Sequence, residues 1–258
     1  MKALLCLMLS LLLVACGGPR GGKPLAVGMD LSYPPFETID EAGKPAGISV
    51  EMAEALGEFL GRPVVIENIP FVGLIPALQS GRVDVVISSM TDTPERRRSI
   101  DFSAPYLTIG LAMLVGKDSP VQSVTDVDQP GRVVVVRQGT TGEAWARRAL
   151  AHAKILAVER ESAAVLEVVQ GGADAFVYDQ MSIWKNWTEH PEKTRALLEP
   201  FQTEQWAIGV RKGNPELVDS VNAFIEAFRS SGGFQRLGEK YLREQMEEFR
   251  KRDLPFYF

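Results

Sequence analysis

Four polar segments, each following a short apolar run, carry the residues of this sequence that are best suited to bind a small ion. They are Asp30–Glu37, Ser88–Arg96, Arg137–Thr141 and Asp179. The sequence shows no Ser-His-Asp spacing and no metal-ligand spacing, since its two histidines are far apart and both cysteines lie within the first 16 residues. These segments therefore predict noncovalent binding, without a metal or a cofactor.

The second segment has the features of an anion site. Ser88–Thr91 is a hydroxyl-rich loop that leads into a short helix, with Thr93 as the N-cap and Pro94 at the first helical position. Free amides at a helix N-terminus favour an anion, and Arg96, one turn later, can hold a carboxylate with two hydrogen bonds. Asp179 ends another apolar run and could meet a cation. Together they suit a free amino acid, which is negative at one end of its backbone and positive at the other.

Each feature also has a structural explanation. Tyr33 and Phe36 could be core aromatics, and for Phe36 the sequence favours that interpretation. Arg96 could belong to a solvated basic surface with the two arginines that follow it. Asp179 could simply cap a helix. Four polar segments at strand ends are harder to explain by chance than any one of them, so binding is the stronger hypothesis.

Strand-like and helix-like runs alternate along the chain and must hold these segments in place. Short strands that alternate with helices predict parallel sheets covered by helices, and the pattern restarts near residue 118, which predicts two α/β lobes. The expected strands are 25–29, 64–66, 83–87, 133–136, 154–158 and 173–177, and the expected helices are 48–60, 74–78, 141–151, 161–170, 179 onward, 215–229 and 233–249.

Two similar segments support the division into lobes. Ser80–Asp84 and Gln170–Asp174 each place a glycine at the end of a helix and enter a buried strand through an aspartate. We therefore expect one structural unit to occur in both lobes. Open α/β sheets bind ligands beyond the carboxyl ends of their strands, which predicts a cleft between the lobes.

The N-terminus is typical of an export signal. Lys2 is followed by about a dozen apolar residues, too few for a membrane-spanning helix. Leu13–Cys16 resembles the lipobox of bacterial lipoproteins; the alternative is an ordinary signal peptide with an incidental cysteine. We expect a signal peptide at 1–15, a lipidated, palmitate-bearing Cys16 with a flexible tether at 16–23, and a location in the periplasm or at the cell surface, held to the membrane by the lipid.

The composition of the 258 residues limits the class of protein. Hydrophobic residues make up 45% and charged residues 24%, which excludes a disordered chain. Only one long apolar run exists, which excludes a polytopic membrane protein. The formal charge of −5 argues against nucleic acid as the main partner.

Several motifs, in a fixed order, resemble one family. The chain resembles the periplasmic amino-acid-binding proteins of ABC importers, in the group that binds polar amino acids, over about residues 24 to 245. The motifs that carry this resemblance are Tyr33–Glu37, Gly47–Val50, Gly73–Leu78, Ser89–Thr91, Pro94–Arg96, Asp101–Tyr106, Gln138–Thr141 and Gly209–Gly213.

This resemblance implies an α/β fold of two lobes, each an open sheet flanked by helices, joined by two hinge strands and closing over the ligand. Lobe 1 would hold residues 24–107 and 207–258, lobe 2 residues 113–202, and the hinges residues 108–112 and 203–206. The ligand-binding residues that the resemblance and the strand-end loops predict are Asp30, Tyr33, Phe71, Ser88, Ser89, Met90, Thr91, Arg96, Arg137, Thr140, Thr141 and Asp179.

The resemblance also implies roles for these residues. Tyr33 and Phe71 would pack on the ligand side chain, and Arg96 would hold the α-carboxylate with amides near Thr91 and Thr141. The α-ammonium would meet Ser89, Thr91 and Asp179, and the side-chain end would meet Asp30 and Arg137.

Three residues depart from the family pattern. Asp92 should make the cleft rim more acidic, and Gly142 and Arg137 differ from the binders of basic amino acids. Arg137 is closer to the lysine of glutamine-type binders and in that role could pair with Asp179. A positive charge here disfavours a cationic ligand unless Asp30 offsets it. We therefore expect a polar L-amino acid, neutral or basic.

The leading hypothesis is a monomeric, lipid-anchored binding protein, not an enzyme, that delivers an amino acid to an ABC permease. A sensory module of the same fold is one alternative. A dehydratase of the prephenate or arogenate type is another; Glu37 and Glu143 are the only glutamates near the predicted cleft loops.

Overall fold

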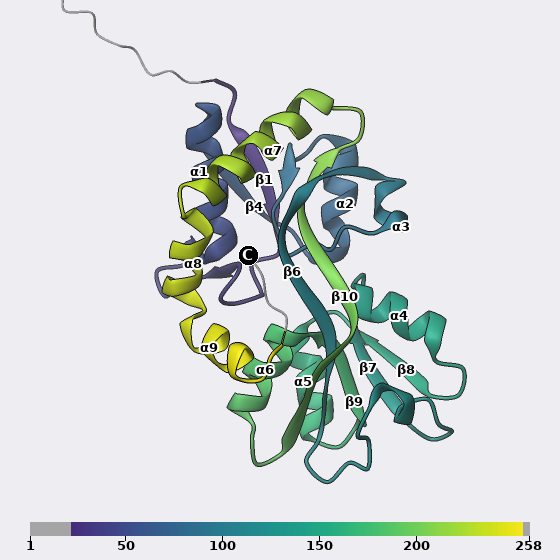
Figure 1. Ribbon diagram of the computed structural model, residues 1–258. Coiled ribbons are helices and arrows are strands. Elements are labelled where there is room, and N and C mark those ends of the chain that lie inside the picture. The colour runs from purple at the N-terminus through teal and green to yellow at the C-terminus, as the bar shows by residue number, and fades with distance from the viewer. Residues whose placement is uncertain (1–21, 255–258) are drawn as a thin grey trace, which may run out of the picture.

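A computed structural model describes residues 22–254 of the chain. A mixed eight-stranded sheet, with the strand order β4-β1-β5-β10-β6-β9-β7-β8, runs through the molecule and is flanked by helices (Figure 1). Its strands are β1 (Leu25–Met29), β4 (Val64–Asn68), β5 (Val85–Val86), β6 (Ile100–Gly116), β7 (Val133–Arg137), β8 (Lys154–Val158), β9 (Ala175–Asp179) and β10 (Thr194–Arg211). A separate hairpin pairs β2 (Thr38–Ile39) with β3 (Pro45–Ala46).

Figure 1 shows two lobes joined by the two long strands β6 and β10. Lobe 1 holds β1, β4 and β5, and lobe 2 holds β7, β8 and β9, so the predicted two-lobed α/β fold is confirmed. The helices are α1 (Ile48–Leu60), α2 (Phe71–Ser80), α3 (Pro94–Arg97), α4 (Thr141–Ala149), α5 (Glu161–Val169), α6 (Gln180–Glu189), α7 (Pro215–Ser230), α8 (Gly233–Tyr241) and α9 (Arg243–Lys251), with a 3-10 turn at Val124–Asp126. Among the described residues, no helix is both long and apolar enough to cross a bilayer.

The crossing strands β6 and β10 make the sheet mixed. Parallel pairing joins β1 to β4 and β5 in lobe 1 and β7 to β8 and β9 in lobe 2, as predicted. β6 and β10 are antiparallel to each other and to their neighbours β9 and β5. Their pairing register shifts between Leu197 and Gln202 and again at Trp206 and Ala207. The apolar patterns did not predict strands of this length, because each strand crosses two environments.

The last predicted helix was wrong in one respect. A single helix over 233–249 was expected, but the chain breaks at Leu242 into α8 and α9. Leu242 has φ −129° and ψ 16° and is fully buried. Its side chain packs in the main core, and the burial of that apolar surface offsets the lost helical geometry.

The repeated unit predicted from the sequence is present in both lobes. Asp84 accepts a hydrogen bond from the β1 backbone at Ala26 and pairs with Arg62 at 2.6 Å. Asp174 accepts one from the β7 backbone at Val133 and pairs with the adjacent arginine at 2.5 Å. Each aspartate thus ties the start of its lobe's first strand to the strand that follows the helix.

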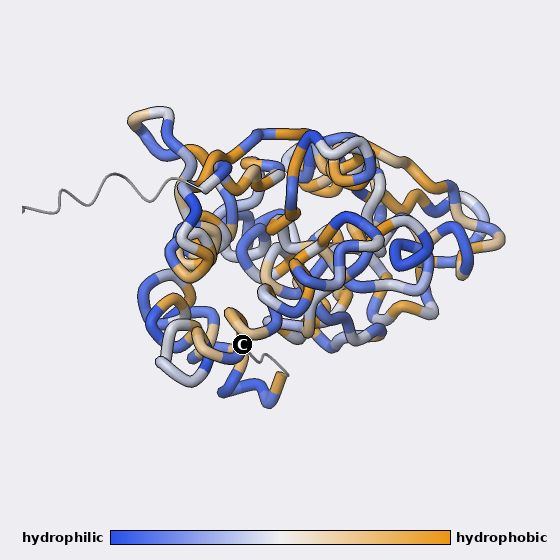
Figure 2. Tube along the Cα trace, turned by 90° about the horizontal axis from the view of Figure 1, so that it is seen from above, coloured by the Kyte–Doolittle hydropathy of each residue, from blue (hydrophilic) through white to orange (hydrophobic). Residues whose placement is uncertain are grey.

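The largest apolar cluster continues through both lobes, from Leu25 in β1 to Phe176 in β9. Two smaller clusters fill the other face of the sheet, one beneath α2 and one beneath α4. Seen from above, hydrophilic and hydrophobic stretches alternate along the outer helices, as expected where one helical face meets the core (Figure 2).

The loop that follows β1 is held by the turn before α1. The amides of Ile48 and Ser49 donate to the carbonyls of Pro35 and Phe36 at 3.1 and 2.8 Å. This close approach needs Gly47, which has φ 113° and whose added Cβ would lie 2.5 Å from the Phe36 oxygen. Gly47 therefore positions the loop that carries the predicted site residues of lobe 1.

Replacing Gly47 by alanine should lower the free energy of unfolding by about 2–3 kcal/mol, because the side chain adds both backbone strain and a backbone clash. Gly43→Ala is the matched control: its φ is 77°, but nothing lies within 4 Å of an added Cβ. Urea unfolding of both variants checks this. Equal losses would show that the contact with the Phe36 carbonyl is unimportant.

Candidate functional site

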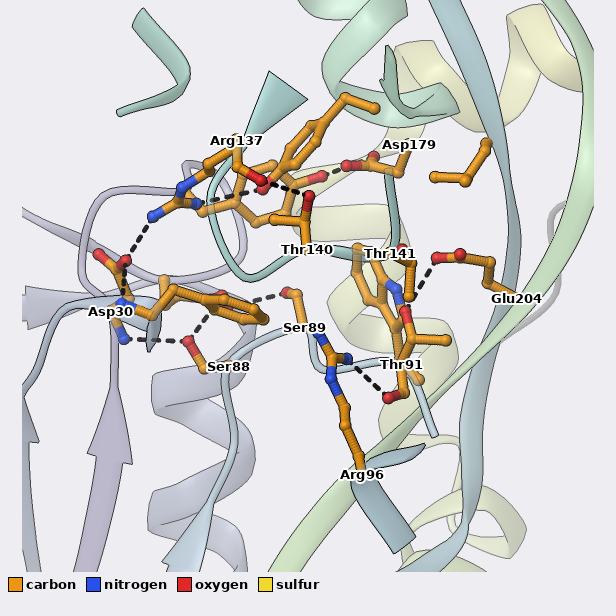
Figure 3. A pocket seen from close by; sticks show the side chains of 16 residues that line it. Asp30, Ser88, Ser89, Thr91, Arg96, Arg137, Thr140, Thr141, Asp179 and Glu204 are labelled. Atoms are coloured by element: carbon orange, nitrogen blue, oxygen red, sulfur yellow. Dashed lines mark hydrogen bonds and ion pairs between the residues drawn. The ribbon is translucent and has the colours of Figure 1, made fainter. Parts of the chain in front are cut away.

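The four polar segments meet in a cavity of about 30 Å³ between the lobes. Every predicted ligand-binding residue except Met90 lines it (Figure 3). The sequence did not predict Leu111, Tyr178, Glu204 and Trp206, and it considered Glu37 only as an enzymatic acid. The lining residues are Asp30, Tyr33, Glu37, Phe71, Ser88, Ser89, Thr91, Arg96, Leu111, Arg137, Thr140, Thr141, Tyr178, Asp179, Glu204 and Trp206.

The Met90 side chain is a correction to the predicted site. It is 1% exposed and packs in the apolar cluster beneath α2, with Leu74 and Ile100. An unbranched apolar side chain gains more from that burial than from a polar cavity. Phe36 also lies in the core, as predicted, stacked on Tyr33 with 5.4 Å between ring centroids.

Arg137 spans the cleft and pairs with Asp30 of lobe 1. The expected pairing of Arg137 with Asp179 was wrong. Its guanidinium also donates to Ser32 Oγ at 3.2 Å, to Tyr178 Oη at 3.1 Å and to the carbonyl of Glu159. Burial lowers the pKa of Arg137, but the Tyr178 hydroxyl and the Asp30 carboxylate beside the guanidinium raise it above its ordinary value. The pair closes one end of the cavity with a neutral unit.

Arg96 is a cation of the cavity that forms no ion pair with any described residue. It donates to the carbonyl of Thr91 at 2.7 Å and, across the cleft, to that of Gly139 at 2.9 Å. Among the described residues, no carboxylate lies within 4.0 Å of its guanidinium. Burial lowers the pKa of Arg96 to about 10, so it is still charged at neutral pH. The aromatic ring of Phe71 lies beside the guanidinium, with 5.4 Å between the guanidinium carbon and the ring centroid.

Asp179 is a buried carboxyl group of the cavity that has no cationic partner among the described residues. It caps α6, accepting from the amides of Met181 and Ser182 at 3.0 and 3.1 Å. It also accepts a 2.6 Å hydrogen bond from Tyr33 Oη across the cleft. Burial raises the pKa of Asp179 to about 7, so a nearby cation would favour its ionised form. The N-cap alternative is therefore correct, and it does not exclude a second role.

Glu37 is a buried carboxyl at the lobe 1 side of the cavity, 1% exposed. It accepts hydrogen bonds from three serine hydroxyls, those of Ser49 at 2.6 Å, Ser89 at 3.1 Å and Ser88 at 3.3 Å. Burial raises the pKa of Glu37 to about 8, although the serine hydroxyls lower it. Glu143 lies elsewhere: it caps the turn at Gly139 and pairs with Arg147.

Glu204 is the carboxylate that the sequence analysis missed. It lies on β10 where the strand crosses between the lobes, is 4% exposed, and accepts from Thr91 Oγ1 and Gln202 Nε2, both at 2.9 Å. In Figure 3 it faces Thr91 from the opposite wall to Arg137. Glu204 stands in the polar stretch Gln202–Gln205, which gave no local signal of a buried site, because strand periodicity alone cannot tell which environment a residue faces.

Asp92, at the rim of the cleft, differs from the expectation. Asp92 forms an ion pair with Arg97 at 2.5 Å, so its charge is offset and the rim gains little acidity. Thr93 caps α3, accepting from the amide of Arg96, and Pro94 begins the helix, as predicted. Gly142 lets α4 pack closely on β9, since an added Cβ would lie 2.7 Å from the Val177 oxygen.

These contacts define what the cavity can bind. Arg96 offers an unpaired positive charge, and Asp179 and Glu204 offer carboxylates without a cationic partner among the described residues. No group of three or more potential ligating residues in the described part of the chain could hold a metal ion. Fold and cavity together define a two-lobed binding protein for a small ligand that carries both charges.

Comparison with known proteins identifies the family. The family model of the bacterial extracellular solute-binding proteins, family 3, matches residues 25–244, and the chain belongs to this family. It is 32% identical over 249 residues to a probable histidine-binding protein of Neisseria gonorrhoeae, covering 92% of both chains. It is 30% identical to an L-cystine-binding protein of Escherichia coli K12, covering 84% of this chain and 82% of that one.

A solved structure supports the same conclusion. The fold is similar to that of an ancestral amino-acid-binding protein described as a precursor of cyclohexadienyl dehydratase. That comparison has a TM-score of 0.78 and 37% sequence identity, and it covers 84% of this chain and 95% of the other. The family members and these relatives are binding proteins, which supports a non-enzymatic function for this chain.

The buried acids should make the ligand-free protein less stable as pH rises. A carboxyl whose folded pKa is raised stabilises the fold below its unfolded pKa, and that contribution is lost as pH rises through the folded value. The free energy of unfolding should therefore fall between about pH 5 and about pH 8. Glu37→Gln should reduce this loss by at least about 1 kcal/mol, because the amide carries no proton to lose.

Urea unfolding at several pH values tests this. The control is Glu95→Gln, at an exposed position in α3, which should keep the wild-type slope. A Glu37→Gln variant with the wild-type slope would show that Glu37 is already ionised at pH 5.

Proposed function

We propose that this chain is the substrate-binding protein of an ABC importer and that it binds a polar L-amino acid between its lobes, without covalent chemistry. The observation that carries the proposal is that Arg96 and Asp179 line the same cavity and that neither forms an ion pair with a described residue. Relatives named as histidine-binding, L-cystine-binding and L-arginine-binding proteins support the ligand class. A monomer in contact with a membrane permease is part of the proposal.

The charges suggest how the ligand lies. Arg96 would hold the α-carboxylate, replacing its present bond to the Gly139 carbonyl. Asp179, with the hydroxyls of Ser89 and Thr91, would hold the α-ammonium. The side chain would pass between Tyr33 and Phe71 toward the Asp30–Arg137 pair. A neutral or basic side chain is compatible with this end, because Asp30 offsets the charge of Arg137.

Hinge motion would admit the ligand. We propose lobe boundaries at 24–107 and 207–258 for lobe 1 and at 113–202 for lobe 2, with hinges at 108–112 and 203–206. The register shifts of β10 near Gln202 and Trp206 lie at the second of these hinges and support it. Closure requires that the ligand fit the closed state better than the open one. Bonds across the cleft from Arg137, Arg96 and Tyr33 already favour closure.

A dehydratase is the second candidate. A protonated acid in the cavity, Glu37, together with the carboxylate-binding guanidinium of Arg96, is the observation in its favour. Appearance of phenylpyruvate, followed by its absorbance in alkali after prephenate is incubated with the protein, would support it. Glu37 is enclosed by serine hydroxyls, which supports a structural role instead.

The primary test is a thermal-shift screen of the refolded, lipid-free protein against the twenty amino acids. Unfolding first matters because a tightly bound ligand can copurify. A ligand at about 100 times its Kd adds roughly 2.7 kcal/mol of stability. A response to one or two polar amino acids supports the proposal, and no response from folded protein contradicts it.

Arg96→Ala should weaken binding of the amino acid found in that screen by about 2–5 kcal/mol, because the ligand carboxylate loses its charged partner. Isothermal titration calorimetry measures the change. Arg97→Ala is the matched control, since this neighbour is exposed and paired with Asp92, and its Kd should change less than about threefold. An Arg96→Ala affinity within that same range would remove Arg96 from the carboxylate site.

The export signal and Cys16 lie outside the described residues, and we propose that residues 1–15 are removed, that Cys16 is lipidated, and that 16–23 tether the protein outside the cytoplasm. The family's description as extracellular binding proteins supports the location. Labelled palmitate should be incorporated into the wild type and not into Cys16→Ser. Labelling of the serine variant would contradict lipidation at this residue.

A further inference from the structure

Glu204 is a buried acid of the ligand cavity that lies outside the sequence motifs of the site. It projects from β10, within the segment 203–206 that we propose as a hinge, and is 4% exposed. Its Oε1 accepts from Gln202 Nε2 and its Oε2 from Thr91 Oγ1, both at 2.9 Å (Figure 3). Both donors are neutral, so these bonds satisfy the carboxylate oxygens without forming an ion pair.

The backbone holds Thr91 against the crossing strand that carries Glu204. Thr91 forms an isolated antiparallel bridge with Trp206, and the next amide, that of Asp92, donates to the carbonyl of Gln205 at 2.9 Å. The Thr91 side chain is 6% exposed and lines the cavity. The hydrogen bond from Thr91 to Glu204 therefore joins two segments that the backbone already keeps together.

This hydrogen bond determines what the Thr91 hydroxyl can offer to a ligand. A threonine hydroxyl has one hydrogen to donate and two lone pairs that accept. Thr91 gives its hydrogen to Glu204, so only the lone pairs of Oγ1 remain for the cavity. An ionised carboxylate accepts and cannot donate, so it keeps the hydroxyl in this orientation. The oriented hydroxyl suits a ligand group that donates, above all a positively charged one.

The charge of Glu204 acts on the same part of the cavity. Burial raises the pKa of Asp179 to about 7, and the Glu204 carboxylate contributes to that rise. The two acids are therefore within electrostatic reach of each other, one on the crossing strand and one at the end of β9 in lobe 2. A cation bound beside both relieves their repulsion, and an uncharged group does not.

We propose that Glu204 is a positioning and specificity-determining residue, which through the Thr91 hydroxyl makes the cavity select an α-ammonium group over an uncharged α-substituent such as a hydroxyl. This inference rests on the proposed function, which places the α-ammonium at Asp179, Ser89 and Thr91. A 2-hydroxy acid with the same carboxylate and side chain fits the Arg96 clamp equally well. Glu204 then separates the two classes of ligand.

Glu204→Gln tests the inference, because glutamine keeps the size of the side chain, removes its charge and can donate to the Thr91 hydroxyl. Competition calorimetry measures L-histidine, L-arginine and L-glutamine and, for the one that the wild type binds most tightly, the 2-hydroxy acid with the same side chain. The variant should bind this amino acid about tenfold more weakly, the loss expected for a hydrogen-bonding network with a charged member. Its affinity for the 2-hydroxy acid should change less than about threefold.

Glu199→Gln is the matched control, since it makes the same substitution on the same strand at an exposed position, and it should change neither affinity more than about threefold. Equal losses for the amino acid and the 2-hydroxy acid in Glu204→Gln overturn the inference, as does an unchanged amino-acid affinity. Both results leave the proposed function standing, because the screen of all twenty amino acids judges it separately. A wild type that binds none of the three amino acids also overturns the inference.

A double-mutant cycle shows whether Glu204 acts through Thr91. In the Thr91→Val background, Glu204→Gln should weaken amino-acid binding at most about threefold, because the hydroxyl that it would reorient is absent. A tenfold loss in both backgrounds contradicts a positioning role. If Glu204→Gln does not fold, Thr91→Val alone decides: it should weaken the amino acid about tenfold and the 2-hydroxy acid less than about threefold, and equal losses overturn the inference.

Discussion

The removal of charge from water is the constraint on which the cleft depends. A charged group in a poorly solvated site must be paired or hydrogen-bonded, because desolvation otherwise costs several kcal/mol. Arg137 and Asp30 meet this requirement together. Within the described part of the chain, Arg96 meets it with carbonyl oxygens, and Asp179 meets it with a tyrosine hydroxyl and two amides. These two groups therefore keep their capacity for a charged ligand, as the proposed function requires.

The crossing strands β6 and β10 convert two α/β units into one binding protein. They place loops from both lobes against one cavity and carry residues of their own, Leu111 and Glu204, into its wall. The hinges proposed in these strands would move the two halves of the site together or apart. The groups that a ligand would join belong to different lobes. The placement of the charges and the placement of the hinges therefore depend on each other.

The Asp30–Arg137 pair is a fixed part of this cavity. Separating it would leave each partner as an uncompensated charge in a poorly solvated site. The other contacts of the pair, those of Asp30 with the Phe71 amide and of Arg137 with Tyr178 and the Glu159 carbonyl, also hold it in place. Glu37 accepts hydrogen bonds from serine hydroxyls, but burial outweighs them and favours its neutral form.

The sequence by itself determined what depends on near neighbours along the chain. The helix over 48–60, the Thr93 and Asp179 caps, the paired aspartate units and the gathering of strand-end loops follow from local patterns and from the rules of α/β sheets. The tertiary structure alone decided which charges meet. Arg137 lies 107 residues from Asp30 and 42 from Asp179, and it pairs with the more distant one because the packing of the two lobes brings Asp30 to it, while Asp179 accepts a hydrogen bond from Tyr33. The tertiary structure also decided that the Met90 side chain packs in the core and that Glu204 faces the cavity. A strand or loop gains its inner and outer faces only when another layer packs against it.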